Sequence, residues 1–127
     1  MRIFHVAAAE DWQAARSTGM YAYSTLGTPL TGGDYIHAAY QHQLRTVRNR
    51  FFAEVYTPLL LLEIDTERLH SPVVHEQPAP GAEEIYPHIY GPINTDAVVG
   101  VRDITRAAET ETETETGQPT SADTVDS

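Results

Sequence analysis

The sequence predicts an α+β domain in which two helices lie beside several short, mostly antiparallel strands. Helical patterns occur only in the first half of the chain, whereas the second half consists of short apolar runs separated by Gly, Pro and Asp. A continuous apolar run at residues 59–64 is too short for a free-standing helix and is typical of a strand buried on both faces. We therefore expect residues 59–64 to form the central strand.

The first elements are a strand at residues 2–7 and a helix at residues 9–18. Glu10 and Asp11 favour a helix start because carboxylates are stabilised near the positive end of the helix dipole. Gly19 is a typical helix stop, since glycine adopts the left-handed conformation at little cost. The chain is then expected to leave this helix directly for the next strand.

A short strand is predicted at residues 20–24, a glycine-rich loop at 27–33 and an extended piece at 34–38. The second helix, residues 41–54, is predicted from apolar residues that recur at spacings of three and four. These residues are Leu44, Val47, Phe51 and Val55. After the central strand, three more strands are predicted from their apolar and β-branched residues, at 73–76, 85–90 and 97–104.

Composition indicates one folded domain, residues 1–104, followed by an acidic tail, residues 105–127. The chain has 127 residues, no cysteine and a formal net charge of −10, and this length suffices to bury a hydrophobic core. The tail alternates Glu and Thr and then continues with small polar residues. Since it holds too few apolar groups to offset the entropy of ordering, we expect it to be disordered.

The charge pattern disfavours a nucleic-acid partner. All basic residues other than histidine are arginines, because lysine is absent, and the acids outnumber them even before the tail begins. A polyanion would therefore be repelled. No apolar run is long enough for a membrane span or a signal peptide, so we expect a cytoplasmic protein without a membrane partner.

The segment most suggestive of a site is the one at residues 84–92, which concentrates a carboxylate, two phenols and an imidazole around two prolines. In an extended chain Glu84, Tyr86, His88 and Tyr90 share one face, because alternate residues point the same way. Such a row either lines a ligand cleft or forms a buried hydrogen-bonded network, and the residues alone leave both open.

Three histidines, His5, His37 and His88, lie in apolar, strand-like settings, where an imidazole can transfer protons, bind hydroxyls or hold a metal. Each alone is more often a structural residue with satisfied hydrogen bonds. No two of them have the close spacing of metal ligands, so no metal is expected. The chain also lacks the glycine-rich nucleotide motifs and the usual nucleophile motifs of hydrolases.

Four segments together resemble the bacterial family named domain of unknown function 952, over about residues 2–101. They are Ile3-Phe4-His5-Val6-Ala7 followed by Asp11-Trp12; Tyr35-Ile36-His37 followed by a helix ending Asn49-Arg50-Phe51-Phe52; Leu60-Leu61-Leu62-Glu63-Ile64-Asp65; and Glu84-Ile85-Tyr86-Pro87-His88-Ile89-Tyr90-Gly91-Pro92. That family resembles a compact ADP-ribosyltransferase-like fold, which implies split small sheets with a nicotinamide-dinucleotide (NAD) cleft between them.

The resemblance implies a role for each candidate residue. His5 would bind a ribose hydroxyl, His37 would lie near the nicotinamide or its ribose, and Glu84 would be the acid that favours an oxocarbenium-like transition state. His37 and Glu84 are thus the catalytic candidates. The candidates for cofactor binding are His5, Tyr86, His88 and Tyr90.

One departure from the family pattern affects the functional prediction. Ala38 and Ala39 follow His37, where the family commonly has a small hydroxyl residue. The leading hypothesis is an NAD-dependent transferase of ADP-ribose with a small-molecule ligand, and the alternative is a non-catalytic small-molecule or protein-binding module on the same fold. An enzyme that removes RNA 2′-phosphates is disfavoured because it would need basic groups.

Overall fold

The computed structural model describes residues 1–51, 55–78 and 81–105. It is an α+β domain of two α-helices and several small antiparallel sheets. The helices are α1 (Ala9–Thr18) and α2 (Leu44–Phe51), with short 3₁₀ turns η1 (Gln41–Gln43) and η2 (Thr95–Ala97). The strands are β1 (Arg2–Ala8), β2 (Met20–Tyr21), β3 (Tyr23–Thr25), β4 (Thr28–Pro29), β5 (Ile36–His37), β6 (Leu59–Asp65), β7 (Val73–Glu76), β8 (Tyr86–Ile89), β9 (Ile93–Asn94) and β10 (Val98–Asp103).

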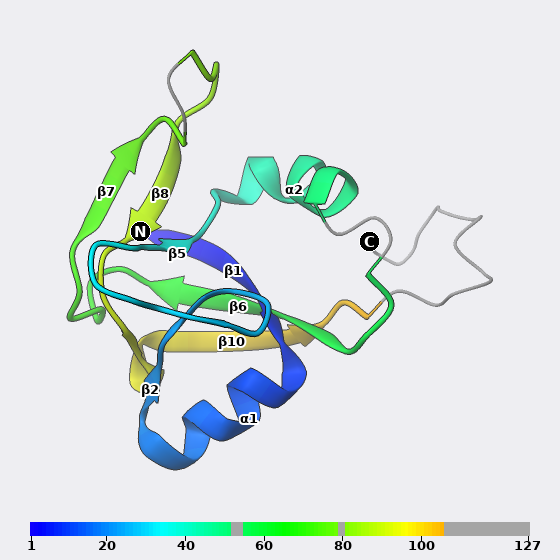
Figure 1. Ribbon diagram of the computed structural model, residues 1–127, viewed down its shortest axis with the longest axis vertical. Coiled ribbons are helices and arrows are strands. Elements are labelled where there is room, and N and C mark those ends of the chain that lie inside the picture. Colours follow the sequence, from blue (N-terminus) through cyan, green and yellow to red (C-terminus); the bar gives the residue numbers. More distant parts are fainter. Residues whose placement is uncertain (52–54, 79–80, 106–127) are drawn as a thin grey trace.

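The most extensive contacts between strands are those within the three-stranded sheet β1-β6-β10, which has β6 in its centre, as predicted (Figure 1). Antiparallel pairing of β1 with β6 runs from Arg2 opposite Asp65 to Ala8 opposite Leu59. β6 buries both of its faces, because Leu62 and Ile64 belong to one core cluster and Leu59 and Leu61 to another. The apolar run at residues 59–64 therefore forms a strand that is buried on both faces.

The two helices cover opposite faces of this sheet, below and above it in Figure 1. Trp12 and Ala15 of α1 pack in the cluster that contains Leu62, whereas Leu44 of α2 packs against the cluster that contains Leu61. α1 begins and ends where predicted, and Gly19 terminates it with a left-handed φ of 87°. Helix α1 is thus fixed by local signals as well as by burial.

A second three-stranded sheet, β5-β8-β7, stands at one end of the first (Figure 1). The two sheets meet through an isolated bridge between Phe4 and Ala39, whose backbone groups exchange two hydrogen bonds of 2.8 Å. Ile36 and Ile89 of the second sheet are fully buried in the same core cluster as Leu62. One face of the second sheet is therefore part of the core.

Several predicted boundaries needed correction. The segment 20–24 is divided at Ala22 into β2 and β3, because β2 pairs with β9 and β3 pairs with β4. The strand predicted at 85–90 covers only Tyr86–Ile89, and that at 97–104 covers Val98–Asp103, since Ala97 belongs to a 3₁₀ turn. Strands β4 and β9 were not predicted, as two residues carry too little periodicity.

The second predicted helix, 41–54, begins with a 3₁₀ turn and continues as α2 to Phe51, and its last residues lie outside the described chain. The acidic tail also lies outside it from residue 106 onward, so its disorder stays a prediction.

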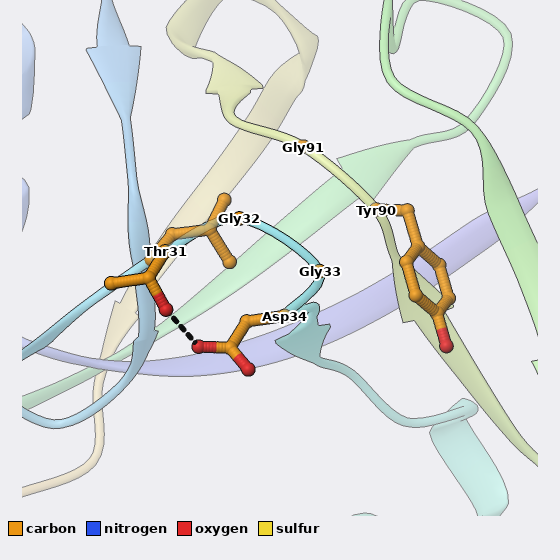
Figure 2. A pocket seen from close by; sticks show the side chains of 7 residues that line it. Thr31, Gly32, Gly33, Asp34, Tyr90 and Gly91 are labelled. Carbon is orange, nitrogen blue, oxygen red and sulfur yellow. Dashed lines mark hydrogen bonds between the residues drawn. The ribbon is translucent and has the colours of Figure 1, made fainter.

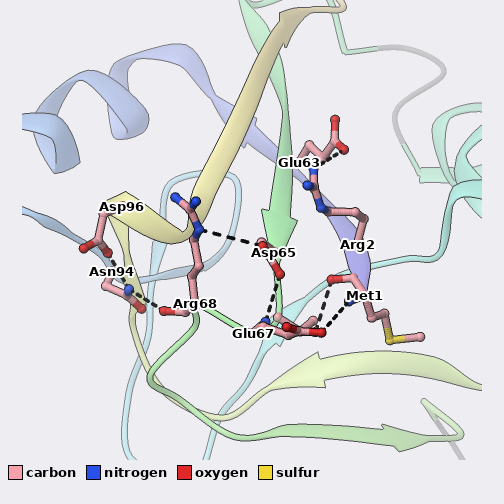
Figure 3. Close-up of polar contacts among 9 residues, drawn as sticks. Met1, Arg2, Glu63, Asp65, Glu67, Arg68, Asn94 and Asp96 are labelled. Carbon is pink, nitrogen blue, oxygen red and sulfur yellow. Dashed lines mark hydrogen bonds and ion pairs between the residues drawn. The ribbon is translucent and has the colours of Figure 1, made fainter.

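Polar contacts tie the start of the chain to the end of β6 (Figure 3). Arg2 pairs with Glu63 across the strands at 2.9 Å, and Asp65 pairs with Arg68 at 3.8 Å in the following turn. The Asn94 side-chain amide donates to the Arg68 carbonyl at 2.9 Å and thereby connects this turn to β9. These acids thus have structural partners.

Candidate functional site

The second sheet has one apolar face and one polar face. In its register Ile36 lies opposite Ile89 and His37 opposite His88. Because the two isoleucines point into the core, the two histidines point to the other face. Tyr35 precedes Ile36 and shares the side of His37, so the polar face is built from alternate positions of β5 and β8.

The rings on this polar face contact one another. Tyr35 stacks on His88, with ring centroids 3.8 Å apart and planes inclined by 13°. The Tyr35 ring also lies 4.9 Å from that of His37 and 5.4 Å from that of Tyr90, and His37 meets His88 edge-on at 6.1 Å. We call these four residues, Tyr35, His37, His88 and Tyr90, the imidazole–tyrosine face.

Glu76 of the edge strand β7 completes the face. Its Oε2 accepts a hydrogen bond from His88 Nδ1 at 2.8 Å and a second, short one from the Tyr90 hydroxyl. Tyr90, followed by His88, holds the pKa of Glu76 below its ordinary value. In turn, the bond to Glu76 raises the pKa of Tyr90 to about 12. Glu76 is therefore a carboxylate, and Tyr90 a neutral phenol, at neutral pH.

The hydrogen bonds define which ring nitrogens are already bonded within the protein. His88 is 2% exposed, and its Nδ1 donates to Glu76 Oε2. His37 is exposed, and its Nδ1 donates to the Ser24 carbonyl at 3.0 Å. Within residues 1–51, 55–78 and 81–105, neither Nε2 has a hydrogen-bond partner. Of the two rings only that of His37 is exposed, so its Nε2 is the nitrogen that a bound hydroxyl can reach.

His5 lies behind the face and not on it. It is 2% exposed, its Nδ1 donates to the His37 carbonyl at 2.5 Å, and its Nε2 accepts from the Tyr21 hydroxyl at 2.9 Å. Burial lowers the pKa of His5 to about 4, so the ring is neutral at neutral pH, as this pair of bonds requires. His5 thus holds the backbone of His37 from the core side.

Glu84 lies just before β8 and Tyr86 is the first residue of β8, and neither takes part in the ring contacts of the imidazole–tyrosine face. Glu84 is exposed in a bend before β8, and its Oε1 accepts from Gln43 Nε2 at 2.9 Å. The same amide of Gln43, a buried residue, donates to the Ile85 carbonyl at 2.9 Å. Tyr86 is half-buried opposite Glu76 in the β7-β8 register. The contacts found in the described chain do not join Glu84 to His37 or His88.

A hollow of about 340 Å³ opens next to the imidazole–tyrosine face. Figure 2 shows Thr31 and Asp34 on one side of it and the Tyr90 ring on the other. Its remaining lining comes from Leu30, Gly32, Gly33 and Gly91. A Cβ added at Gly32 or Gly33 would meet nothing within 4 Å, so these two glycines border open space.

The structure brings His37, His88 and Tyr90 together, with His5 directly behind them. It adds Tyr35 and Glu76, which the sequence reasoning did not select. Two signals pointed to them: Tyr35 has the parity of His37, and a hairpin of the strands predicted at 73–76 and 85–90 places Glu76 opposite Tyr86. In the described part of the chain, no group of three or more His, Asp or Glu side chains is arranged to hold a metal ion.

Comparisons with known proteins give a family and a fold. The model of the family described as "Protein of unknown function (DUF952)" matches residues 6–101, so the chain belongs to this family. Among solved structures it is similar to the crystal structure of protein CC0527 from Caulobacter crescentus, with a TM-score of 0.63 and 22% identity over 81% of this chain and 85% of that one. A double methionine mutant of CC0527 gives a TM-score of 0.62 and 21% identity over the same shares.

These similarities to CC0527 show the fold alone, because the identities are low. No protein with a curated description matches the chain. No helix in the described ranges combines the length and apolarity needed to span a membrane.

Proposed function

We propose that this member of the DUF952 family binds NAD or a related ADP-ribose compound on the imidazole–tyrosine face and transfers its ADP-ribose group. The observation that carries the proposal is the convergence of the exposed His37 imidazole, the buried His88 imidazole, two phenol rings and one carboxylate beside a hollow. Perturbed titratable groups next to a concave surface are typical of functional sites.

The geometry suits the two kinds of group that such a ligand presents. A ribose hydroxyl can donate to Nε2 of the exposed His37, and a planar ring can pack against the exposed part of Tyr35 or Tyr90. The ligand class itself is supported by the resemblance of the four sequence segments to the DUF952 family, which in turn resembles a compact ADP-ribosyltransferase-like fold. The relationship of this chain to ADP-ribosyltransferases is itself part of the proposal.

In the proposed reaction, Glu76 takes the role that the sequence suggested for Glu84. The bond between the ribose C1′ and the nicotinamide nitrogen breaks, and nicotinamide leaves with the electron pair. Glu76 stabilises the positive charge that develops on the ribose. A hydroxyl acceptor or water then forms the new bond to C1′ and gives its proton to Nε2 of His37.

A specific observation favours a second candidate, a non-catalytic binding module. Both ring nitrogens of His5 are bonded within the protein, and Glu84 is bonded to Gln43. Two of the predicted ligand-facing groups thus act as supports in this structure, as expected where a fold binds a ligand without transforming it. In this alternative the face still holds a small molecule, and the C1′ bond stays intact.

Calorimetric titration with NAD and with ADP-ribose tests binding. We expect wild type to bind at least one of them and His37→Ala to weaken binding by about tenfold or more, because a hydrogen-bond acceptor for the ligand is lost. His70→Ala is the matched control, since His70 is also exposed but lies away from the ring contacts. An absence of heat with both ligands at millimolar concentration would refute the proposal.

Release of free nicotinamide, followed by chromatography, separates the two candidates. The transferase predicts release that falls by about 100-fold in Glu76→Gln, because the neutral amide stabilises developing positive charge less well. Binding without any nicotinamide release in wild type, with water or added hydroxyl acceptors, would leave the binding module.

A further inference from the structure

The hollow beside the imidazole–tyrosine face has a fixed negative group on one wall. Asp34 Oδ2 accepts a hydrogen bond from Thr31 Oγ1 at 2.5 Å, and the Asp34 backbone N–H donates to the Thr31 carbonyl at 3.0 Å (Figure 2). These two bonds close the loop around Asp34 and fix its side chain. Its second oxygen, Oδ1, has no hydrogen-bond partner in residues 1–51, 55–78 and 81–105.

The opposite wall is aromatic and equally fixed. The Tyr90 hydroxyl is bound to Glu76, which anchors the far end of the ring, and Tyr35 lies 5.4 Å from it. A phenol ring held in this way offers its face to a cation, which the negative potential of the ring attracts. The lining of the hollow includes one carboxylate and neither an arginine nor a histidine.

The amides of Gly32 and Gly33 are the one feature of the loop that could attract an anion, since successive backbone N–H groups can cradle a phosphate. The Asp34 carboxylate directly follows them and opposes an anion at the same place. A phosphate here would have to overcome this like charge without a basic side chain in the lining. The balance of charge therefore favours a cation.

We propose that Asp34 and Tyr90 make this hollow a subsite for a planar ring that carries positive charge, and that it discriminates against anionic groups. The inference deepens the proposed function and rests on it in one respect: the ring would be the pyridinium of the nicotinamide ligand. The pyrophosphate then lies outside the hollow. A volume of about 340 Å³ fits this division, because it is at the small end of ligand pockets and holds part of a dinucleotide.

A charge series of small probes tests the inference without NAD. The probes are 1-methylnicotinamide, which is a cation, nicotinamide, which is neutral, and nicotinate, which is an anion. Each is titrated at low ionic strength while the backbone amide resonances of residues 31–34, 90 and 91 are followed by NMR. We expect the cation to bind about tenfold more tightly than the anion, and the difference to shrink in high salt.

Asp34→Asn provides the decisive variant, because the amide keeps the acceptor for Thr31 and removes the charge. We expect the ratio of the dissociation constants of the anion and the cation to fall to about twofold or less. Asp103→Asn is the matched control: it makes the same change on β10, in the other sheet, and should keep the wild-type ratio.

Three outcomes would each overturn the inference. Nicotinate could bind as tightly as 1-methylnicotinamide, the ratio of their dissociation constants could be unchanged in Asp34→Asn, or the six amide resonances could show no chemical-shift change with any probe. These outcomes are distinct from failure of the proposed function, which the NAD and ADP-ribose titrations decide. If NAD binds but the three probes bind with equal affinity, the proposed ligand class is retained and the charge-selective subsite is refuted.

Discussion

The two three-stranded sheets use the same residue type for opposite purposes. In β1-β6-β10, His5 is buried and both of its ring nitrogens are bonded within the protein. In β5-β8-β7, His37 and His88 each bond through Nδ1, and neither Nε2 has a partner in the described chain. The first sheet therefore uses both ring nitrogens of its histidine, whereas the second leaves one ring nitrogen of each histidine unbonded, and that of His37 is on an exposed side chain.

This difference indicates how to separate a supporting imidazole from one that can act on a ligand. Burial alone does not separate them, because His5 and His88 are both 2% exposed. The separating property is the number of ring nitrogens already satisfied by the protein. We therefore expect stability to depend mainly on the first sheet and ligand chemistry on the second.

The largest expected effect is loss of stability in the first sheet. Leu62→Ala should lower the free energy of unfolding by about 3 kcal/mol, since Leu62 is fully buried and the change leaves a cavity. Val101→Ala is the control: Val101 lies opposite Leu62 in the register but is exposed, so its effect should stay within about 0.5 kcal/mol. Urea denaturation measures both, and equal effects would contradict a stability centred on β6.

The second prediction concerns the pH dependence that His5 confers. Its pKa is about 4 in the folded protein and 6.5 in the unfolded chain, so between these values the unfolded state binds the extra proton. Stability should therefore fall by about 3 kcal/mol as the pH decreases from 6.5 to 4.

His5→Gln should remove most of this slope, because the amide offers a donor and an acceptor but does not titrate. Urea midpoints measured across this pH range provide the test. The slope is compared above pH 4.5, because the lowered pKa of Glu76 means that its own stabilising contribution is lost as the pH falls below this ordinary value. A slope that persists in His5→Gln would show that His5 is not the buried neutral ring described here.

A smaller effect is expected at the junction of the second sheet and the hollow. Gly91 has φ of 146°, and an added Cβ would lie 2.5 Å from Ser71 Oγ. Gly91→Ala should thus cost about 2 kcal/mol. Gly32→Ala, in open space on the other wall, should leave the unfolding free energy within about 1 kcal/mol of wild type. Thermal or urea unfolding of the pair checks this, and a harmless Gly91→Ala would argue against the close approach to Ser71.

The smallest effect is a change in titration that leaves the fold intact. The pKa of Tyr90 is about 12 because its hydroxyl is bonded to the Glu76 carboxylate. In Glu76→Gln it should return toward the ordinary value of 10, as the neutral amide no longer opposes the phenolate charge. NMR of the tyrosine ring carbons against pH, assigned with Tyr90→Phe, measures it, and Glu10→Gln on α1 serves as the charge control. An unchanged Tyr90 titration would remove Glu76 from the imidazole–tyrosine face.

The elements that could be predicted from the sequence are those with strong local patterns. Helix α1 was predicted with its exact bounds from two acids at its start and a glycine at its end. β6 was predicted as the central strand because its apolar run is too long to be exposed and too short for a helix. The two-residue strands β4 and β9 were missed, since their existence depends on partners elsewhere in the chain.

The candidate site could be predicted only in part, for the same reason. Strand parity correctly placed Tyr86 and His88 on alternate positions of β8, but β8 begins only at Tyr86, so parity does not extend back to Glu84. The roles given to Glu84, His37 and the cofactor-binding residues stay predictions.

The sequence by itself determined the family, the α+β class and the positions of the main elements, because these depend on periodicity and end signals within short stretches of chain. Only the tertiary structure decided that Glu76 is the acid bonded to His88 and that His5 supports His37 from behind. Those contacts join residues far apart in sequence through strand register and the meeting of two sheets, and the direction of a hydrogen bond across them is not encoded in any local pattern.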